Sequence, residues 1–265
     1  MSTCDGDCLS GNPREQVRQL YTELALHPER DFGWGRGREN ARSLGYAADW
    51  LERLPGCVWE SAAAVGNPFS LGLPLPGETI VDVGCGAGAD ACVAAMLVGG
   101  QGRVVGIDCT PAMVVKAARN AQAAGLSNIR FIEAEMSALP LPDACVDMVI
   151  SNGVINLSPD KTQVFREALR VLKPGGRLAI SDVVATAELP DEVKDDPKLH
   201  SSCVAGAAMV DDLQAMLEAA AFHDVRITPK DESREFIRDW VPGSGVEDYV
   251  VSAHIEAIKP PPDNV

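Results

Sequence analysis

Long hydrophobic runs are missing from this sequence, and so is any excess of basic residues. A membrane-spanning helix needs about 20 consecutive apolar residues, and no stretch of the 265 residues approaches that length. The N-terminal residues, which include Asp5 and Asp7, are polar and unlike a signal peptide. Lys and Arg total 23 against 38 Asp and Glu, a formal net charge of −15, which disfavours nucleic acid or an anionic membrane as a partner. We therefore expect a cytoplasmic protein that binds neither nucleic acid nor membrane.

Metal-ligand spacings are also absent. The eight cysteines include no C-x-x-C pair, and the four histidines show no spacing typical of a metal site or a catalytic triad. We predict no resident metal, and in the cytoplasm we expect reduced thiols. Four cysteines lie in or beside predicted core elements, where cysteine packs as a small hydrophobic residue: Cys85, Cys92, Cys109 and Cys145. The other four lie outside the predicted core, and their role stays open: Cys4, Cys8, Cys57 and Cys203.

What the chain does contain is a glycine-rich turn at residues 78–91, ETIVDVGCGAGADA. A short run of β-forming residues leads into three alternate glycines, and an alanine-rich apolar run follows. This order predicts a buried strand, a tight turn and the start of a helix. Because glycine has no β-carbon, a ligand can lie against the backbone at Gly84, Gly86 and Gly88. The same turn opens dinucleotide sites, so a nicotinamide enzyme is one alternative, but no Gly-Lys-Ser/Thr phosphate motif is present.

Two acids accompany the turn. Asp82 lies on the predicted strand two residues before the first glycine, and Asp108 ends a second predicted strand. A carboxylate about 20 residues beyond such a turn can accept hydrogen bonds from both hydroxyls of a ribose. The two acids therefore favour a nucleoside-containing ligand.

Strand and helix patterns alternate from residue 79 onward, which predicts an α/β fold with a mostly parallel sheet and helices on both faces. Before this stretch, helical spacing is found at 15–26, 39–44 and 47–54. After it, a helix begins at Asp211. The predicted strands are 79–83, 103–107, 129–133, 146–151, 176–183, 224–228 and 248–258, and the helices of the alternating stretch are 89–98, 111–124 and 160–171.

At these residues the chain resembles the class I S-adenosylmethionine (SAM) methyltransferases. Residues 81–88 are similar to the first motif of that family, residues 106–108 to the second, and Leu-Lys-Pro-Gly-Gly at 172–176 to a third. The resemblance implies a Rossmann-like sheet whose final hairpin is antiparallel, with SAM as cofactor. It also implies three segments: a helical lid at 1–70, a SAM-binding core at 71–185, and a part at 186–265 that completes the sheet and the substrate pocket.

The same resemblance assigns cofactor residues by position. The glycine turn and Asp82 are expected to line the methionine and ribose, Asp108 to hold the ribose hydroxyls, and Glu135 with Met136 to contact the adenine edge. Met113 packs either on the adenine or in the core. Ser151 and Asn152 are expected to face the methionine part and the substrate. Phe32 and Trp34 are either lid residues or anchors of their loop. The full set of cofactor candidates is Asp82, Gly84, Cys85, Gly86, Gly88, Asp108, Cys109, Met113, Glu135, Met136 and Ser151.

A closer resemblance is to the arsenite methyltransferases. Residues 151–161, SNGVINLSPDK, are similar to a Ser-Asn-Cys-Val-x-Asn-Leu-Ser-x-Asp-Lys motif of that family, and residues 202–207 to its Cys-Val-x-Gly-Ala. Residues 235–243 and 249–253 resemble the C-terminal end of many bacterial members. The last two stretches are not general methyltransferase features, so they distinguish this family from other members of the class.

The family holds arsenic(III) by cysteine thiolates, as suits a thiophilic centre, and here that pattern is incomplete. Val65 and Gly153 stand where two of the family's cysteines would be, and Cys203 alone matches. Either Cys57, Cys4 or Cys8 replaces the missing thiolates, or the substrate has changed to an organic nucleophile or an already alkylated metalloid.

The predicted function is therefore SAM-dependent methyl transfer to a trivalent arsenical or related metalloid, with Cys203, Asn152 and Cys57 as the candidate catalytic residues. The alternatives are methylation of a small organic nucleophile at carbon, oxygen, nitrogen or sulfur, and a non-catalytic protein that binds SAM or a metalloid. The sequence carries no signal for an oligomeric state.

Overall fold

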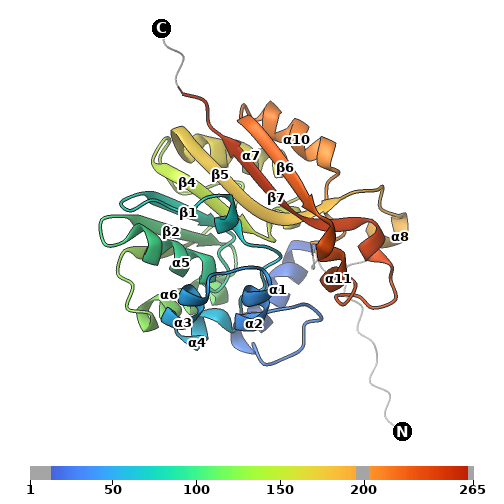
Figure 1. Cartoon of the computed structure of the whole chain (residues 1–265), viewed down its shortest axis with the longest axis horizontal. Helices are drawn as coiled ribbons and strands as arrows, with labels where there is room; N and C mark the ends of the chain where they lie inside the picture. The colour runs from blue at the N-terminus through green and yellow to red at the C-terminus, as the bar shows by residue number, and fades with distance from the viewer. Residues whose placement is uncertain (1–12, 195–202, 262–265) are drawn as a thin grey trace.

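A seven-stranded sheet forms the centre of the computed structural model, which describes residues 13–194 and 203–261 (Figure 1). The strand order is β3-β2-β1-β4-β5-β7-β6. All neighbours are parallel except β7, which runs antiparallel to both β5 and β6. The predicted mostly parallel sheet with an antiparallel end is confirmed. The strands are β1 (Thr79–Val83), β2 (Arg103–Asp108), β3 (Ile129–Glu133), β4 (Val146–Asn152), β5 (Leu172–Ala185), β6 (His223–Lys230) and β7 (Val250–Ile258).

Helices cover both faces of this sheet, and the side chains of the strands alternate between them. In β1, Ile80 packs with the helices α5 (Ala89–Val98) and α6 (Pro111–Ala123), while Val81 packs with α7 (Lys161–Val171) and α10 (Val210–Ala219). The α5 helix is alanine-rich and buried on nearly all sides, whereas α7 buries one apolar stripe. No helix of the described residues is long and apolar enough to cross a membrane.

Short helices precede the sheet on the α5–α6 side. Leu24 near the end of the first helix is fully buried and packs with Ala87 and Met113, so this helix closes over the glycine turn. The predicted helices of this region are confirmed, and α4 was not predicted. The elements are α1 (Pro13–Leu26), α2 (Gly37–Ser43), α3 (Ala48–Arg53), α4 (Gly56–Trp59) and the 3-10 turn η1 (Pro68–Leu71).

The C-terminal insertions gather beside the ends of β5 and β7 (Figure 1). A separate apolar cluster there joins Cys203 and Val204 to Ile237, Val246 and, from the N-terminal part, Val65. Segments far apart in the sequence therefore share one small core. The short elements are η2 (Ile155–Leu157), α8 (Asp191–Lys194), η3 (Asp231–Ser233), α11 (Arg234–Ile237) and η4 (Val246–Asp248).

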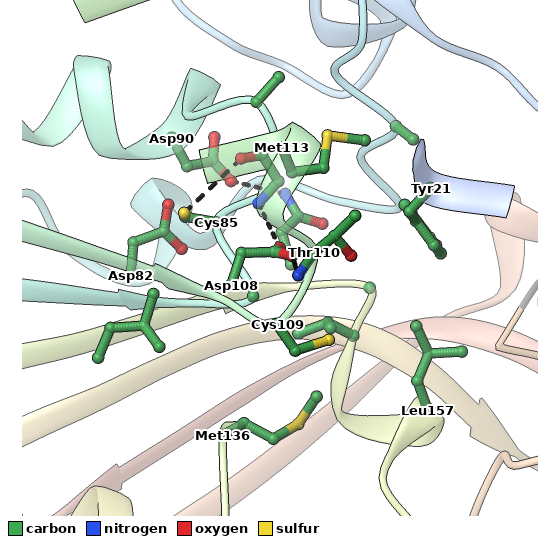
Figure 2. Close-up of a pocket in the computed structure, with 18 of the residues that line it drawn as sticks. Tyr21, Asp82, Cys85, Asp90, Asp108, Cys109, Thr110, Met113, Met136 and Leu157 are labelled. Atoms are coloured by element: carbon green, nitrogen blue, oxygen red, sulfur yellow. Dashed lines mark hydrogen bonds between the residues drawn. The ribbon is translucent and has the colours of Figure 1, made fainter. Parts of the chain in front are cut away.

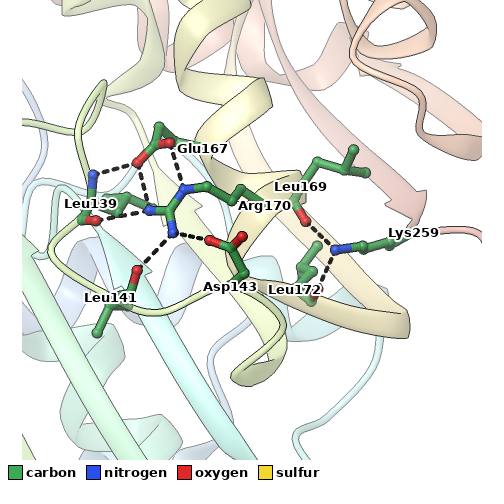
Figure 3. Close-up of polar contacts among 8 residues, drawn as sticks. All are labelled: Leu139, Leu141, Asp143, Glu167, Leu169, Arg170, Leu172 and Lys259. Atoms are coloured by element: carbon green, nitrogen blue, oxygen red, sulfur yellow. Dashed lines mark hydrogen bonds and ion pairs between the residues drawn. The ribbon is translucent and has the colours of Figure 1, made fainter.

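The fifth strand starts earlier than predicted, at Leu172 instead of residue 176. Leu172 pairs with Val146, and the register shifts before Met148. Figure 3 shows why this region is held firmly. Arg170 donates to the Leu139 and Leu141 carbonyls and pairs with the carboxylates of Asp143 and Glu167. The Lys259 ammonium donates to the Leu169 and Leu172 carbonyls (2.8 and 2.6 Å) at the C-terminal end of α7, where a cation is favoured.

Candidate active site

A large pocket lies at the carboxyl ends of β1, β2 and β4, where ligands bind in open parallel sheets. It encloses about 1320 Å³, part of it open to solvent. The α1 helix forms one wall through Arg14, Val17, Arg18 and Tyr21. Figure 2 shows Asp82, Cys85 and Asp90 grouped on one side, with Tyr21 reaching in from α1 on the other.

Asp82 brings an unsatisfied carboxylate to this pocket. The residue is 2% exposed, and its Oδ2 atom has no hydrogen-bond partner. Burial raises the pKa of the carboxyl well above its ordinary value, and the neighbouring Asp90 and Asp108 raise it further, while a hydrogen bond from the Ala91 N–H lowers it. A buried acceptor without a donor is costly. A positively charged ligand group would therefore be stabilised beside it.

Asp108 fastens the glycine turn to the next helix. Its Oδ2 accepts from the Gly86 N–H at 2.9 Å, and its Oδ1 accepts from the Thr110 N–H at 2.8 Å. Burial raises the pKa of this carboxyl, and these two backbone donors oppose the rise. Each oxygen of an ionised carboxylate can accept a further hydrogen bond, so Asp108 can hold two ligand hydroxyls without losing its structural role.

Of the three glycines at which the sequence predicts space for a ligand, only Gly86 would leave an added β-carbon free of contact. A β-carbon on Gly88 (φ +83°) would lie 3.0 Å from Ala117 Cβ and from the Phe131 ring. A β-carbon on Gly84 (φ +72°) would lie 2.4 Å from a Val154 methyl, so this glycine is needed for packing. By contrast, a β-carbon on Gly86 (φ +51°) would meet no atom within 4 Å. The backbone at Gly86 is therefore open on the side that lines the pocket.

Asn152 lines the pocket, but its amide is already engaged. Its Nδ2 donates to Asp90 Oδ2 at 3.0 Å and to the Gly66 carbonyl at 2.9 Å, and its Oδ1 accepts from the Val65 N–H at 3.1 Å. The Tyr46 hydroxyl donates to the other oxygen of Asp90 at 2.6 Å. Sequence reasoning missed Tyr46 and Asp90. The one available signal was an acid in the first turn of the helix that follows the glycines.

The remaining cofactor candidates divide into two groups. Cys85, Cys109, Met113, Glu135 and Met136 all line the pocket. Met113 is 1% exposed and packs in the core with Leu24 and Ala87, as one of its two predicted roles requires, while its contact with the adenine stays a prediction. Ser151 and Gly88 do not line the pocket. The Ser151 hydroxyl donates to the Val83 carbonyl at 2.7 Å and ties β4 to β1.

A second, smaller cavity of about 330 Å³ adjoins the pocket. Both are lined by Tyr21, Ala63, Ala64 and Gly153. The smaller one adds Val65 and Cys203, so the three positions that resemble the family's arsenic site do meet in space. Its other walls are aromatic: Trp34 and Trp240.

Cys203 is the thiol of this cavity. It is 3% exposed, adopts φ +66°, a conformation rare outside glycine, and its Sγ donates to the Gly153 carbonyl at 2.9 Å. Burial raises the pKa of the thiol well above its ordinary value, Asp182 raises it further, and Lys161 opposes the rise. The group is therefore a neutral thiol in the ligand-free protein.

Asp182 acts electrostatically on Cys203 and was also missed. Its carboxylate accepts from the Ile155 N–H at 2.8 Å and from Asn156 Nδ2 at 3.0 Å, which fixes the turn after Gly153. Burial raises its pKa to about 6, against hydrogen bonds from the Val183 and Ile155 N–H groups. Asp182 belongs to none of the motifs identified in the sequence, so no local pattern singles it out.

The other cysteines do not join Cys203 in the described residues. Cys57 on α4 packs partly buried against the α5–α6 side of the core and lines neither cavity. Cys4 and Cys8 lie outside the described residues. Within residues 13–194 and 203–261, no three His, Cys, Asp or Glu side chains gather in a way that could hold a metal ion.

The loop at 31–36 has the anchoring role predicted for it, and its role as a lid over the cofactor stays a prediction. Phe32 packs with Leu24 and Met113, as an anchor would. Trp34 lines the smaller cavity, and its buried indole Nε1 has no hydrogen-bond partner. The two rings lie 5.8 Å apart between centroids.

The larger pocket fits SAM on chemical grounds. The unpartnered Asp82 oxygen suits an ammonium group, the Asp108 carboxylate suits ribose hydroxyls, and the backbone is open at Gly86. These residue contacts stay predictions.

Comparison with known proteins agrees with this reading. A family model described as a methyltransferase domain matches residues 75–221. The chain is 48% identical to an arsenite methyltransferase of Halobacterium salinarum, over 95% of this chain and 68% of that protein. It is 38% identical to an arsenite methyltransferase of Aquipseudomonas alcaligenes, over 67% of this chain and 54% of that protein, so it spans about half of that relative's length.

Among solved structures, an arsenic(III) S-adenosylmethionine methyltransferase from Chlamydomonas reinhardtii matches with a TM-score of 0.64 and 32% identity, over 85% of this chain and 75% of that one. The fold, the glycine turn and these relatives lead to one conclusion. The chain belongs to the arsenite methyltransferase family and is a SAM-dependent methyltransferase.

Proposed function

We propose that this methyltransferase transfers the methyl group to a trivalent arsenical bound to the sulfur of Cys203. The observation that carries the proposal is the shared wall between the two cavities, formed by Tyr21, Ala63, Ala64 and Gly153. It brings a buried thiol next to the cofactor pocket. Sulfur is the ligand that a soft, thiophilic arsenic(III) centre prefers.

The residues of the larger pocket have binding and orienting roles in this proposal. When bound, SAM supplies an activated methyl group on a positively charged sulfonium, so the chain needs no strong acid or base for the transfer. Asp82 would hold the ammonium end of the cofactor and Asp108 its ribose. Asn152 holds the segment that follows the shared wall of the two cavities, since it accepts from the Val65 N–H and donates to the Gly66 carbonyl, and Asp90 accepts from Asn152. Alignment of the acceptor with the methyl group then supplies most of the rate enhancement.

The cytoplasm is the proposed site of action. A thiol that must bind arsenic has to stay reduced, and that compartment keeps thiols reduced. All six cysteines among the described residues are free.

The test is a comparison of Cys203→Ser with Cys57→Ser. Each variant is incubated with SAM, a thiol reductant and either arsenite or methylarsonous acid, and methylated arsenic is quantified by elemental speciation. We expect Cys203→Ser to lose methylation by about 100-fold or more while its affinity for SAM is unchanged. Cys57→Ser should keep full activity. Full activity in Cys203→Ser would remove the thiol from the proposal.

One observation favours a second candidate, a small organic acceptor. Val65 and Gly153 line the cavity where the family has thiols, and the resulting wall is apolar. If no arsenical is methylated although SAM binds, release of S-adenosylhomocysteine with small organic thiols, amines or phenols would support this candidate instead.

A further inference from the structure

Resting on the proposed function, we propose that the acceptor is a diorganic trivalent arsenical, R₂As–OH with two small apolar substituents, bound by one arsenic–sulfur bond to Cys203. Arsenite itself, which carries three hydroxyl groups, is the poorer acceptor. The inference follows from the number of thiols in the cavity, its apolar walls and the neutral state of its sulfur.

The cavity supplies one thiol among its described residues. Cys85 and Cys109 line the cofactor pocket but not this cavity, and Cys57 lines neither. Trivalent arsenic makes three bonds, so two of them must go to groups that an incoming acceptor already carries. An acceptor with two carbon substituents meets this condition without further protein ligands.

Where the family resemblance places a second arsenic-binding thiol, this chain has the methyl groups of Val65. A β-carbon on Gly153 would lie 3.1 Å from Val65 Cγ1, so the valine side chain packs directly over the glycine. Gly153 also adopts φ +65°, where a side chain would be strained. At these two positions the protein therefore offers hydrocarbon and bare backbone to the acceptor.

The remaining walls suit organic substituents as well. No charged side chain lines the cavity among the described residues. Trp34 and Trp240 are each held by a second ring, Phe32 at 5.8 Å and Phe236 at 5.6 Å between centroids. Methyl groups lose little on entering such a site, whereas arsenite hydroxyls would lose their hydrogen bonds to water.

Two polar groups remain for the oxygen of the product. The Trp34 indole N–H is buried without a partner, and Tyr21 brings a hydroxyl to both cavities. An arsenic-bound oxygen is a strong acceptor, and a buried donor without a partner is rare in folded proteins.

The steps balance without an added reductant. R₂As–OH condenses with the thiol: the arsenic–sulfur bond forms, the arsenic–oxygen bond breaks, and water leaves with the thiol proton. The arsenic lone pair forms the bond to the methyl carbon, and the carbon–sulfonium bond breaks. Water then adds to the cationic arsenic, and the arsenic–sulfur electron pair returns to Cys203. The products are R₂(CH₃)As=O, the free thiol, S-adenosylhomocysteine and one proton.

A neutral sulfur agrees with this sequence of steps. Cys203 donates its proton to the Gly153 carbonyl, and burial together with Asp182 raises the pKa of the thiol. Condensation with a neutral thiol brings no net charge into the cavity, so the site pays no cost for burying one.

The experiment compares three probes on the full chain with SAM: dimethylarsinous acid, methylarsonous acid and arsenite. We expect kcat/KM for dimethylarsinous acid to exceed that for arsenite by about tenfold or more. Native mass spectrometry should find one adduct that is lost in Cys203→Ser, with the mass of dimethylarsinous acid less one water. Arsenite methylated as fast as dimethylarsinous acid would overturn the inference while leaving the proposed function in place.

A gained thiol sharpens the test. Val65→Cys adds a second sulfur to the cavity and should raise the preference for methylarsonous over dimethylarsinous acid by about tenfold. The matched control, Val65→Ala, removes the same methyl groups without adding sulfur and should leave that ratio within about twofold. An unchanged ratio in Val65→Cys would contradict the one-thiol site.

Two further outcomes separate the possible failures. Arsenite turnover that disappears in Cys4→Ser/Cys8→Ser would mean that other thiols complete the site, and it would overturn the inference. No methylated arsenic from any probe, with SAM still bound, would defeat the proposed function itself.

Discussion

The two adjoining cavities differ in what lines them and in how the chain builds them. The larger pocket is acidic, with Asp82, Asp90 and Asp108 all on its walls. The smaller one has a neutral thiol and aromatic rings, and none of its described lining residues is charged. The first is formed largely at the ends of adjacent strands, the second by loops from distant parts of the chain. This division lets the acceptor site change while the cofactor site is kept.

The buried acids of the larger pocket destabilise the protein when no ligand is bound. Burial raises the pKa of Asp82, Asp90 and Asp108 alike. Asp90 has the Tyr46 hydroxyl and Asn152 as donors, whereas one Asp82 oxygen has none. A ligand that carries positive charge relieves this repulsion. A substitution that removes one of these negative charges should therefore stabilise the ligand-free protein and weaken its affinity for the cofactor.

Asp82→Asn tests that opposition and has the largest expected effect. The raised pKa means that the folded protein disfavours the charged carboxylate, so the neutral amide should raise the free energy of unfolding by about 1 kcal/mol. Loss of a charge-assisted hydrogen bond should weaken SAM affinity by about 100-fold, or about 2–3 kcal/mol. Calorimetric titration with SAM and urea unfolding measure the two quantities on the same sample.

Asp147→Asn is the control for this comparison. Asp147 lies at the other end of the sheet, where its carboxylate accepts from the Thr79 N–H and pairs with the Lys173 ammonium. This variant should lose some stability and keep its affinity for SAM. If Asp82→Asn instead lost stability and kept affinity, Asp82 would be a structural residue only.

The contrast between the cavities also explains what the sequence could predict. Gly84, Gly86 and Asp82 lie within a few residues of one another, and Asp108 ends the next strand, so local pattern and spacing were enough to place them together. The mostly parallel sheet with its antiparallel end followed from the alternation and from the family resemblance, whereas the order of the strands was not predicted. Nothing local predicts that Tyr46 meets Asp90 and Asn152, which are 44 and 106 residues away from it.

The smaller cavity was predictable only in part. The resemblance indicated that positions 65, 153 and 203 belong together, and the structure brings them into one cavity. It gave no hint of Trp240 or of Tyr21, because loop and helix side chains meet there through tertiary packing alone. The suggestion that Cys57 joins Cys203 finds no support, since Cys57 packs against the α5–α6 side of the core and lines neither cavity.

Asp182→Asn tests whether a buried acid near the smaller cavity contributes to the free energy of unfolding. Its expected effect is intermediate. The folded pKa of Asp182 is about 6 and its ordinary value is 3.8, so the folded state binds the proton more tightly. Its contribution to stability is therefore fully present below the ordinary value and is lost as pH rises through 6. The stability of the wild type relative to Asp182→Asn should rise by about 2 kcal/mol as pH falls from about 7 to about 4.5.

Urea unfolding at both pH values measures this change, and Asp147→Asn is the control. Burial raises the pKa of Asp147, but hydrogen bonds from Lys173 and Thr79 outweigh it, and the pKa is lowered overall. Because the ordinary pKa of Asp147 is 3.8 and its folded value is lower, the difference between the wild type and Asp147→Asn should stay nearly constant in this range and shrink only on further acidification. A constant difference for Asp182→Asn across the same range would show that its carboxyl does not titrate in the folded state near pH 6.

The smallest expected effect concerns α1, the helix that reaches both cavities. Arg18 lines only the cofactor pocket and pairs with Glu133 at 3.5 Å, and both side chains are largely exposed (40% and 52%). Such a pair contributes little, so Arg18→Gln should weaken SAM affinity by no more than about threefold at low salt, and the difference should vanish near 0.5 M salt, roughly. Arg53→Gln, which removes a similar exposed pair with Asp49 on α3, should change nothing in the same titration. A loss of about tenfold that persists at high salt would mean that Arg18 contacts the cofactor directly, and that the polar character of the larger pocket extends onto the helix that covers it.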